Sequence, residues 1–122
     1  AYGQSKLANV LFTYELARRL AGTNITVNAL DPGGVATNIG KNDGLIPWAK
    51  HLVYYLLKRE LLTPKQGSQT SVFLASDNSV YGASGKYFYQ KKEKKSADES
   101  YDVIKAKKLW ELSEQLCGIK FL

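Results

Sequence analysis

The first twenty residues carry hydrophobic side chains at steps of three and four, which places them along one side of an α-helix. The pattern predicts a helix over residues 2–21. Arg18 and Arg19 suit the negative end of the helix dipole, and Gly22 is a natural stop. Glu15 and Arg19 are spaced to pair on the polar side. The stripe comprises Leu7, Val10, Leu11, Tyr14, Ala17 and Ala21, and its breadth predicts packing on a sheet and a second helix.

A short run rich in β-branched residues follows at 25–30 and predicts a strand. The strand ends in Asp31-Pro32-Gly33-Gly34, which cannot continue a ladder. A helix followed by a turn and a buried strand is half of a βαβ unit and implies a parallel sheet, whose ligands bind at the carboxyl ends of the strands. Residues 32–37 lie there, and Thr37 offers a hydroxyl. Their glycines would let the backbone approach a ligand, although a plain turn needs glycines equally.

Residues 38–62 are a long insertion at this edge of the predicted sheet. Insertions of this length at a ligand crevice are usually lids or substrate loops. The alternative interpretation is an amphipathic helix that covers the core. The bulky apolar face consists of Trp48, Leu52, Tyr55, Leu56 and Leu62. His51, the only histidine of the chain, reads as an exposed helix residue.

Thr63-Pro64-Lys65-Gln66 is a capping box with proline at the first helical position, and it predicts a helix to about residue 75. This helix is expected to turn Val72, Phe73 and Leu74 inward. Residues 85–90 predict a second strand, with Tyr87 and Tyr89 on one side and Phe88 on the other. Residues 91–122 are a basic linker followed by a last helix over 103–116, whose stripe is Leu109, Leu112 and Leu116.

The composition is that of one small globular domain covering all 122 residues, with 44% hydrophobic and 23% charged residues. The net charge of +6 comes largely from lysines after residue 85, but Glu93, Asp98 and Glu99 interrupt them, which favours a solvated loop over a nucleic-acid surface. Cys117 is the only cysteine, so a reducing, intracellular setting is expected. No metal-ligand spacing is present. The chain lacks methionine and begins within a helix, from which we expect a fragment of a longer protein.

Tyr2 and Lys6 are the residues that carry chemistry. Positions i and i+4 of a helix share one face, with Cβ atoms roughly 5–6 Å apart. A fixed cation beside a phenol favours the phenolate and makes the pair a candidate proton-transfer device for a carbonyl or an alcohol. The spacing alone also fits an ordinary helix whose lysine extends into water.

Together, the Tyr2-x-x-x-Lys6 helix, the strand running into Pro32-Gly33 and the Thr63-Pro64-Lys65-Gln66-Gly67 helix start resemble the C-terminal half of a short-chain dehydrogenase/reductase. Ser5-Lys6-Leu7-Ala8-Asn9 and Leu109-Trp110-Glu111-Leu112-Ser113 make the retinol dehydrogenase-like branch the most similar. The resemblance covers nearly the whole chain. It implies an α/β fold, the C-terminal part of a Rossmann-like, doubly wound parallel sheet whose N-terminal cofactor-binding half is absent.

The resemblance also implies roles for matching residues. Tyr2 would be the catalytic acid-base, and Lys6 would activate it and hold the nicotinamide ribose of NADP or NAD, with NADP slightly favoured. Pro32, Gly33, Val35 and Thr37 would line the nicotinamide pocket. The substrate would be a small apolar alcohol or aldehyde, retinoid- or lipid-like, bound under the lid residues Trp48, Leu52, Tyr55 and Leu56.

The family's glycine-rich loop and catalytic serine would lie before Ala1, so we expect the chain alone to be inactive. Relatives in this branch are often attached to intracellular membranes, which implies a cytoplasmic or membrane-bound parent protein, anchored through a segment before Ala1. Homo-oligomers also fit the resemblance. The alternative function is a non-catalytic, truncated dehydrogenase-like interaction module.

Overall fold

The computed structural model describes residues 1–36 and 61–121. Helix α1, Tyr2–Arg19, is followed by strand β1, Ala29–Asp31, and after residue 60 by helices α3, Pro64–Gly67, and α4, Gln69–Ser76. A 3₁₀ turn, η2 (Asn78–Val80), leads to strands β2, Tyr87–Tyr89, and β3, Lys92–Glu93. A second 3₁₀ turn, η3 (Asp98–Tyr101), precedes helix α5, Val103–Cys117.

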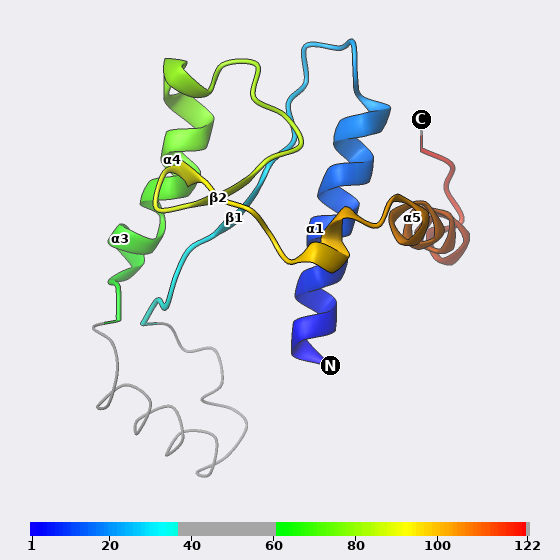
Figure 1. Cartoon of the computed structure of the whole chain (residues 1–122), viewed down its shortest axis with the longest axis horizontal. Coiled ribbons are helices and arrows are strands. Elements are labelled where there is room, and N and C mark those ends of the chain that lie inside the picture. Colours follow the sequence, from blue (N-terminus) through cyan, green and yellow to red (C-terminus); the bar gives the residue numbers. More distant parts are fainter. Residues whose placement is uncertain (37–60, 122) are drawn as a thin grey trace.

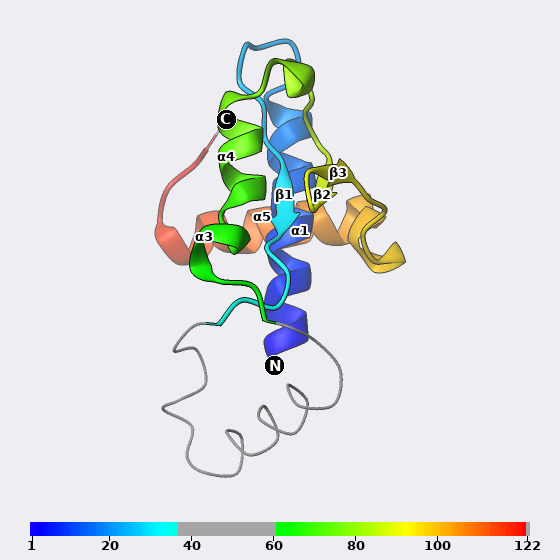
Figure 2. The same ribbon diagram turned by 90° about the vertical axis from the view of Figure 1, so that its left-hand side faces the viewer.

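The three strands form one small mixed sheet in the order β1-β2-β3. β1 and β2 are parallel, with Leu30 opposite Phe88, and β2 and β3 are antiparallel, with Phe88 opposite Glu93. Helices α1 and α4 lie on opposite sides of the sheet, and α5 runs across the outer side of α1 (Figure 1, Figure 2). This layering confirms the predicted α/β class and the parallel pairing of the two predicted strands.

The core lies between the sheet, α1 and α5. Its buried hydrophobic members are Leu11, Tyr14, Phe88, Ala106 and Trp110. Phe88 is buried between the half-buried Tyr87 and Tyr89, as the alternation predicted. The Tyr14 hydroxyl is 2.7 Å from Ser96 Oγ, which ties the segment after β3 to α1. None of the helices in the described residues is long and apolar enough to cross a membrane.

The first strand is shorter than predicted. It begins at Ala29 because side chains take the ladder positions before it. The Val27 amide donates to Ser84 Oγ, and the Asn28 side chain bonds the carbonyl of Ala83 and the amide of Lys86. Ile25, predicted to lie in the strand, is 57% exposed.

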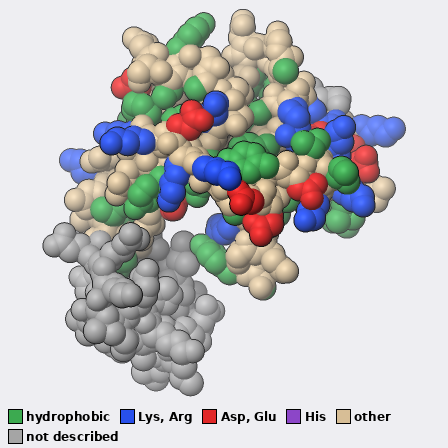
Figure 3. All heavy atoms as spheres, viewed as in Figure 1, with side chains coloured by type: hydrophobic (Ala, Val, Ile, Leu, Met, Phe, Trp, Pro, Cys, Tyr) green, Lys and Arg blue, Asp and Glu red, His purple; other side chains and the backbone are tan. Residues whose placement is uncertain are grey.

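Residues 91–95 are exposed, as predicted for a solvated segment, but they also contain strand β3, which was not predicted. Gln90 and Lys91 both adopt positive φ, which reverses the chain directly after β2. Two ion pairs lie around β3, Lys86–Glu93 and Lys95–Asp98. On this face of the molecule basic and acidic side chains are interspersed (Figure 3).

Two predicted helix faces are confirmed only in part. The helix after Thr63 is divided at Ser68; its Phe73 and Leu74 are half-buried as expected, but Val72 is 60% exposed. In α5, Leu109 is half-buried as expected, but Leu112 is 51% and Leu116 80% exposed. Instead α5 buries Ala106 and Trp110, because Trp110 stacks on Phe12 of α1 with ring centroids 5.3 Å apart.

Candidate active site

Tyr2 and Lys6 lie together on the first turns of α1. The Lys6 ammonium is 5.3 Å from the centroid of the Tyr2 ring. The Tyr2 side chain is 71% exposed, so its hydroxyl is accessible to a ligand. The Ser5 hydroxyl donates to the Tyr2 carbonyl oxygen at 2.8 Å, which secures the backbone of this turn. The predicted convergence of the phenol and the cation is therefore present in the structure.

The turn after β1 lies at the same end of the molecule. β1 points toward the end of the molecule where α1 begins, and residues 32–36 emerge there (Figure 2). The Asp31 carboxylate accepts a hydrogen bond from the Gly33 amide at 2.8 Å, and Gly33 has a φ of +78°. That left-handed conformation favours glycine. Pro32 is exposed, whereas Gly33 and Val35 are half-buried.

Two backbone hydrogen bonds join the end of this turn to the residues just before helix α3. Val35 pairs with Leu62 in parallel register, through Leu62 N to the Gly34 carbonyl at 2.8 Å and Ala36 N to the Leu62 carbonyl at 2.9 Å. Leu62, predicted as part of the apolar face of residues 38–62, therefore serves as a backbone partner of the turn. Thr37 and the predicted lid residues Trp48, Leu52, Tyr55 and Leu56 lie outside the described residues, as does His51.

Helix α3 packs against the bridge between Val35 and Leu62. The predicted capping box is confirmed: Thr63 Oγ1 accepts from the Gln66 amide, and Gln66 Oε1 accepts from the Thr63 amide at 2.8 Å. Gly67 of α3 is buried against the side chain of Val35, and a methyl group on Gly67 would lie 2.4 Å from Val35 Cγ2. Sequence reasoning did not recognise this contact. Its only signal was a glycine inside a helix, which usually has a packing reason.

A charged network holds α1 against α5. Glu15 is only 3% exposed, which corrects the prediction that it lies on the polar side. Its carboxylate accepts from Arg18 and, at 2.8 Å, from Arg19, whose guanidinium lies 4.5 Å from the centroid of the Trp110 ring. Burial opposes ionisation of Glu15, but the hydrogen bonds and charges of Arg18 and Arg19 outweigh it, so the pKa of this carboxyl is lowered. Removing both arginines would leave the buried carboxylate of Glu15 without its charged partners.

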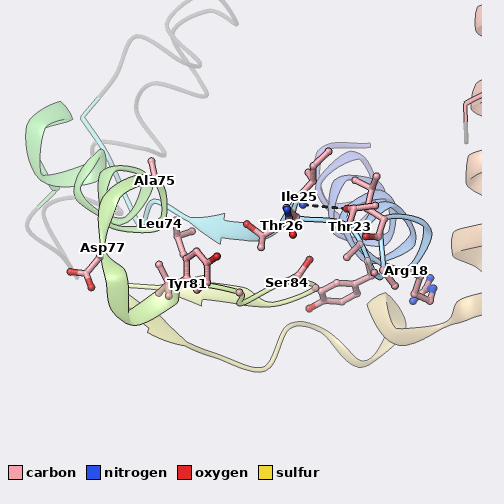
Figure 4. A pocket seen from close by; sticks show the side chains of 18 of the residues that line it. Arg18, Thr23, Ile25, Thr26, Leu74, Ala75, Asp77, Tyr81 and Ser84 are labelled. Carbon is pink, nitrogen blue, oxygen red and sulfur yellow. Dashed lines mark hydrogen bonds between the residues drawn. The ribbon is translucent and has the colours of Figure 1, made fainter.

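A cavity of about 980 Å³ lies at the other end of the molecule. The loop after α1 and the segment after α4 line it, including Arg18, Asp77, Tyr81 and Ser84 (Figure 4). Both segments are far from the end where α1 begins (Figure 1). Ligands of parallel sheets bind at the carboxyl ends of the strands, so this cavity is not the candidate site.

The residues at the α1 end suit a nicotinamide cofactor. An accessible phenol, a neighbouring cation and a glycine turn at the carboxyl end of a parallel strand lie at this same end of the molecule (Figure 2). Gly34 is exposed, which leaves its backbone open to close approach by a planar ring.

Comparison with known proteins agrees with these features. Residues 1–89 match a family model described as enoyl-(acyl carrier protein) reductase. The chain belongs to the short-chain dehydrogenase/reductase family, which confirms the resemblance inferred from Tyr2, Lys6 and the Pro32-Gly33 turn.

Within this family the chain is similar to retinol and polyprenol dehydrogenases. It is 47% identical to human retinol dehydrogenase 14 over 118 residues, which are 97% of this chain and 35% of that protein. It is 41% identical to human polyprenol dehydrogenase over 122 residues, covering 98% of this chain and 36% of the relative. For human retinol dehydrogenase 13 the identity is 40%, covering 98% and 37%. The chain thus spans little more than a third of the length of these relatives.

Proposed function

We propose that the chain forms the C-terminal third of an NAD(P)(H)-dependent oxidoreductase, here called the full-length protein. It would interconvert an apolar alcohol and its carbonyl compound. The proximity of the Lys6 ammonium and the Tyr2 ring, 5.3 Å apart, carries this proposal. Membership of the short-chain dehydrogenase/reductase family supports it.

Tyr2 Oη would transfer the proton. In the reductive direction it donates to the carbonyl oxygen of the substrate, and in the oxidative direction it accepts the proton of the alcohol. Lys6 would act as its activator, with its ammonium placed beside the Tyr2 ring. The exposure of the Tyr2 side chain is what makes its hydroxyl available for this role.

Lys6, Pro32, Gly33, Val35 and Thr37 would hold the nicotinamide half of the cofactor. Bound there, the cofactor supplies or accepts the hydride. The Asp31–Gly33 hydrogen bond keeps the turn in the shape that brings its backbone to the surface. We favour NADP over NAD on the basis of the family resemblance.

The substrate class follows from the relatives and from the composition of residues 38–62. Retinol and polyprenol, in the names of the relatives, are long apolar alcohols. Trp48, Leu52, Tyr55 and Leu56 would provide an apolar cover for a molecule of this kind. The single cysteine of the chain and the family resemblance lead us to place the full-length protein inside the cell, in the cytoplasm or on an intracellular membrane.

The test is a Tyr2→Phe substitution in the full-length protein, assayed with NADPH and retinal. Loss of the proton donor should lower kcat by about 10²-fold or more. Because Tyr2 is 71% exposed, the thermal midpoint should stay unchanged. Tyr81→Phe is the matched control, since Tyr81 is 94% exposed and lines the opposite cavity. Full activity in the Tyr2→Phe variant would show that the acid-base assignment is wrong.

A further inference from the structure

Tyr89 lies directly beside the glycine turn of the candidate site. It is the last residue of β2 and pairs in register with Asp31, the last residue of β1. A methyl group on Gly33 would lie 3.7 Å from Tyr89 Cε2 and 3.1 Å from Leu62 Cδ1. The Tyr89 ring and the Leu62 side chain therefore cover Gly33 at van der Waals distance.

The ring of Tyr89 is itself held in place by the β2–β3 hairpin. The Lys94 ammonium is 4.9 Å from the centroid of the ring, a distance at which a cation is attracted to an aromatic face. The hairpin turn is fixed to α4, because the Lys91 amide donates to Thr70 Oγ1. The hairpin thus presents a fixed aromatic surface to the turn at residues 32–34.

Gly33 needs such support because it contributes no side chain of its own. One hydrogen bond, from its amide to Asp31, shapes the turn from within. Other contacts must stop a glycine with a φ of +78° from rotating away, since glycine backbones are the most freely rotating. Truncating the ring would leave a space into which the turn can move.

We infer that Tyr89 is a positioning residue that holds the backbone of residues 32–34 in the geometry that receives the nicotinamide. The inference rests on the proposed function, which assigns Pro32 and Gly33 to the cofactor pocket. Tyr89 acts through the turn and touches no reacting atom. Its loss should therefore weaken cofactor binding more than it slows the chemical step.

The experiment compares three variants of the full-length protein with NADPH and retinal. Tyr89→Ala should raise KM for NADPH about five- to tenfold while kcat stays within about twofold. Tyr89→Phe keeps the ring and should behave like the wild type. Tyr87→Ala is the matched control: it removes the same ring from the same side of β2, but opposite Ala29 and away from the turn. It should lower the thermal midpoint without changing KM for NADPH.

Equal KM values in Tyr89→Ala and Tyr87→Ala would overturn the inference. If Tyr89→Ala does not fold, Tyr89→Leu, which keeps apolar volume without the planar ring, takes its place. Fluorescence titration of NADPH separates the two proposals, because it needs no turnover. A Kd raised only in the Tyr89 variants supports the positioning role even if retinal is not reduced, whereas wild-type protein that binds NADPH but transfers no hydride contradicts the proposed function alone.

Discussion

Val35 and Gly67 are in such close contact that the space for a Gly67 side chain is already filled. The Val35 methyl groups occupy it, at 2.4 and 3.1 Å from where a Cβ would stand. Val35 is also the residue that pairs with Leu62 in the β-bridge. The helix that begins at the Thr63 capping box is thereby joined to the turn that forms the candidate cofactor pocket.

Gly67→Ala should therefore destabilise the full-length protein. Overpacking of a filled site costs about 1–3 kcal/mol, and urea denaturation measures it. Gly3→Ala is the matched control, because Gly3 also lies in a helix but has nothing within 4 Å of the added methyl group. There the substitution should raise stability by up to about 1 kcal/mol, the gain in helix propensity. Equal effects of the two substitutions would show that the Val35 contact is unimportant.

Replacing Lys6 tests the cation of the candidate site. Lys6→Met keeps most of the apolar stem and removes the charge beside Tyr2. We expect kcat/KM with NADPH and retinal to fall by about tenfold or more, which corresponds to at least about 1.4 kcal/mol of lost transition-state stabilisation. Lys107→Met, on the exposed side of α5, should leave the kinetics unchanged. Identical kinetics for both variants would exclude Lys6 from the mechanism.

Glu15 should make stability depend on pH. Its pKa is lowered in the folded protein, because Arg18 and Arg19 outweigh the opposing effect of burial. Its stabilising contribution is therefore complete above the usual value near 4.5 and is lost as the pH falls through the lowered pKa. Glu15→Gln should cost about 1.5–3 kcal/mol at pH 7, from lost charged hydrogen bonds, and progressively less below pH 4.5.

Thermal denaturation of wild type and variant at pH 7 and pH 3 measures this difference. Glu99→Gln, at an exposed carboxylate, is the control and should show little change at either pH. A Glu15→Gln defect of the same size at both pH values would mean that packing, and not charge, is responsible.

The 122-residue chain alone should not reduce retinal with NADPH. It spans only 35% of the length of human retinol dehydrogenase 14, and tight dinucleotide binding needs a glycine-rich phosphate loop of the kind that begins a Rossmann fold. Absorbance at 340 nm follows the reaction, with the full-length protein as the positive control. Measurable turnover by the purified chain would contradict this expectation.

Local patterns predicted those parts of the fold that depend on neighbours in sequence. The Thr63–Gln66 capping box was readable because its partners are three residues apart. The Tyr2–Lys6 pair was readable because one helical turn brings the two side chains together. The burial of Phe88 followed from the alternation of β2.

Features that depend on tertiary packing could not be predicted from local sequence patterns. In α5 both the face with Leu112 and the face with Trp110 are apolar, and Trp110 is the buried one, packed against Phe12 and Arg19 of α1. Glu15 has the spacing of a surface residue, but the folded chain buries it. The contacts of Val35 with Gly67 and of Gly33 with Tyr89 join residues more than thirty positions apart, which no sequence period encodes.

The bridge between Val35 and Leu62 has an evolutionary consequence. It fixes both ends of the intervening segment by backbone hydrogen bonds, which place no demand on side-chain identity. The entropy cost of joining two fixed ends grows slowly with the number of residues between them, by about 0.6 kcal/mol for each doubling. Descendants of this protein could therefore gain, lose or exchange residues between these anchors while the sheet and helix α1 stay intact.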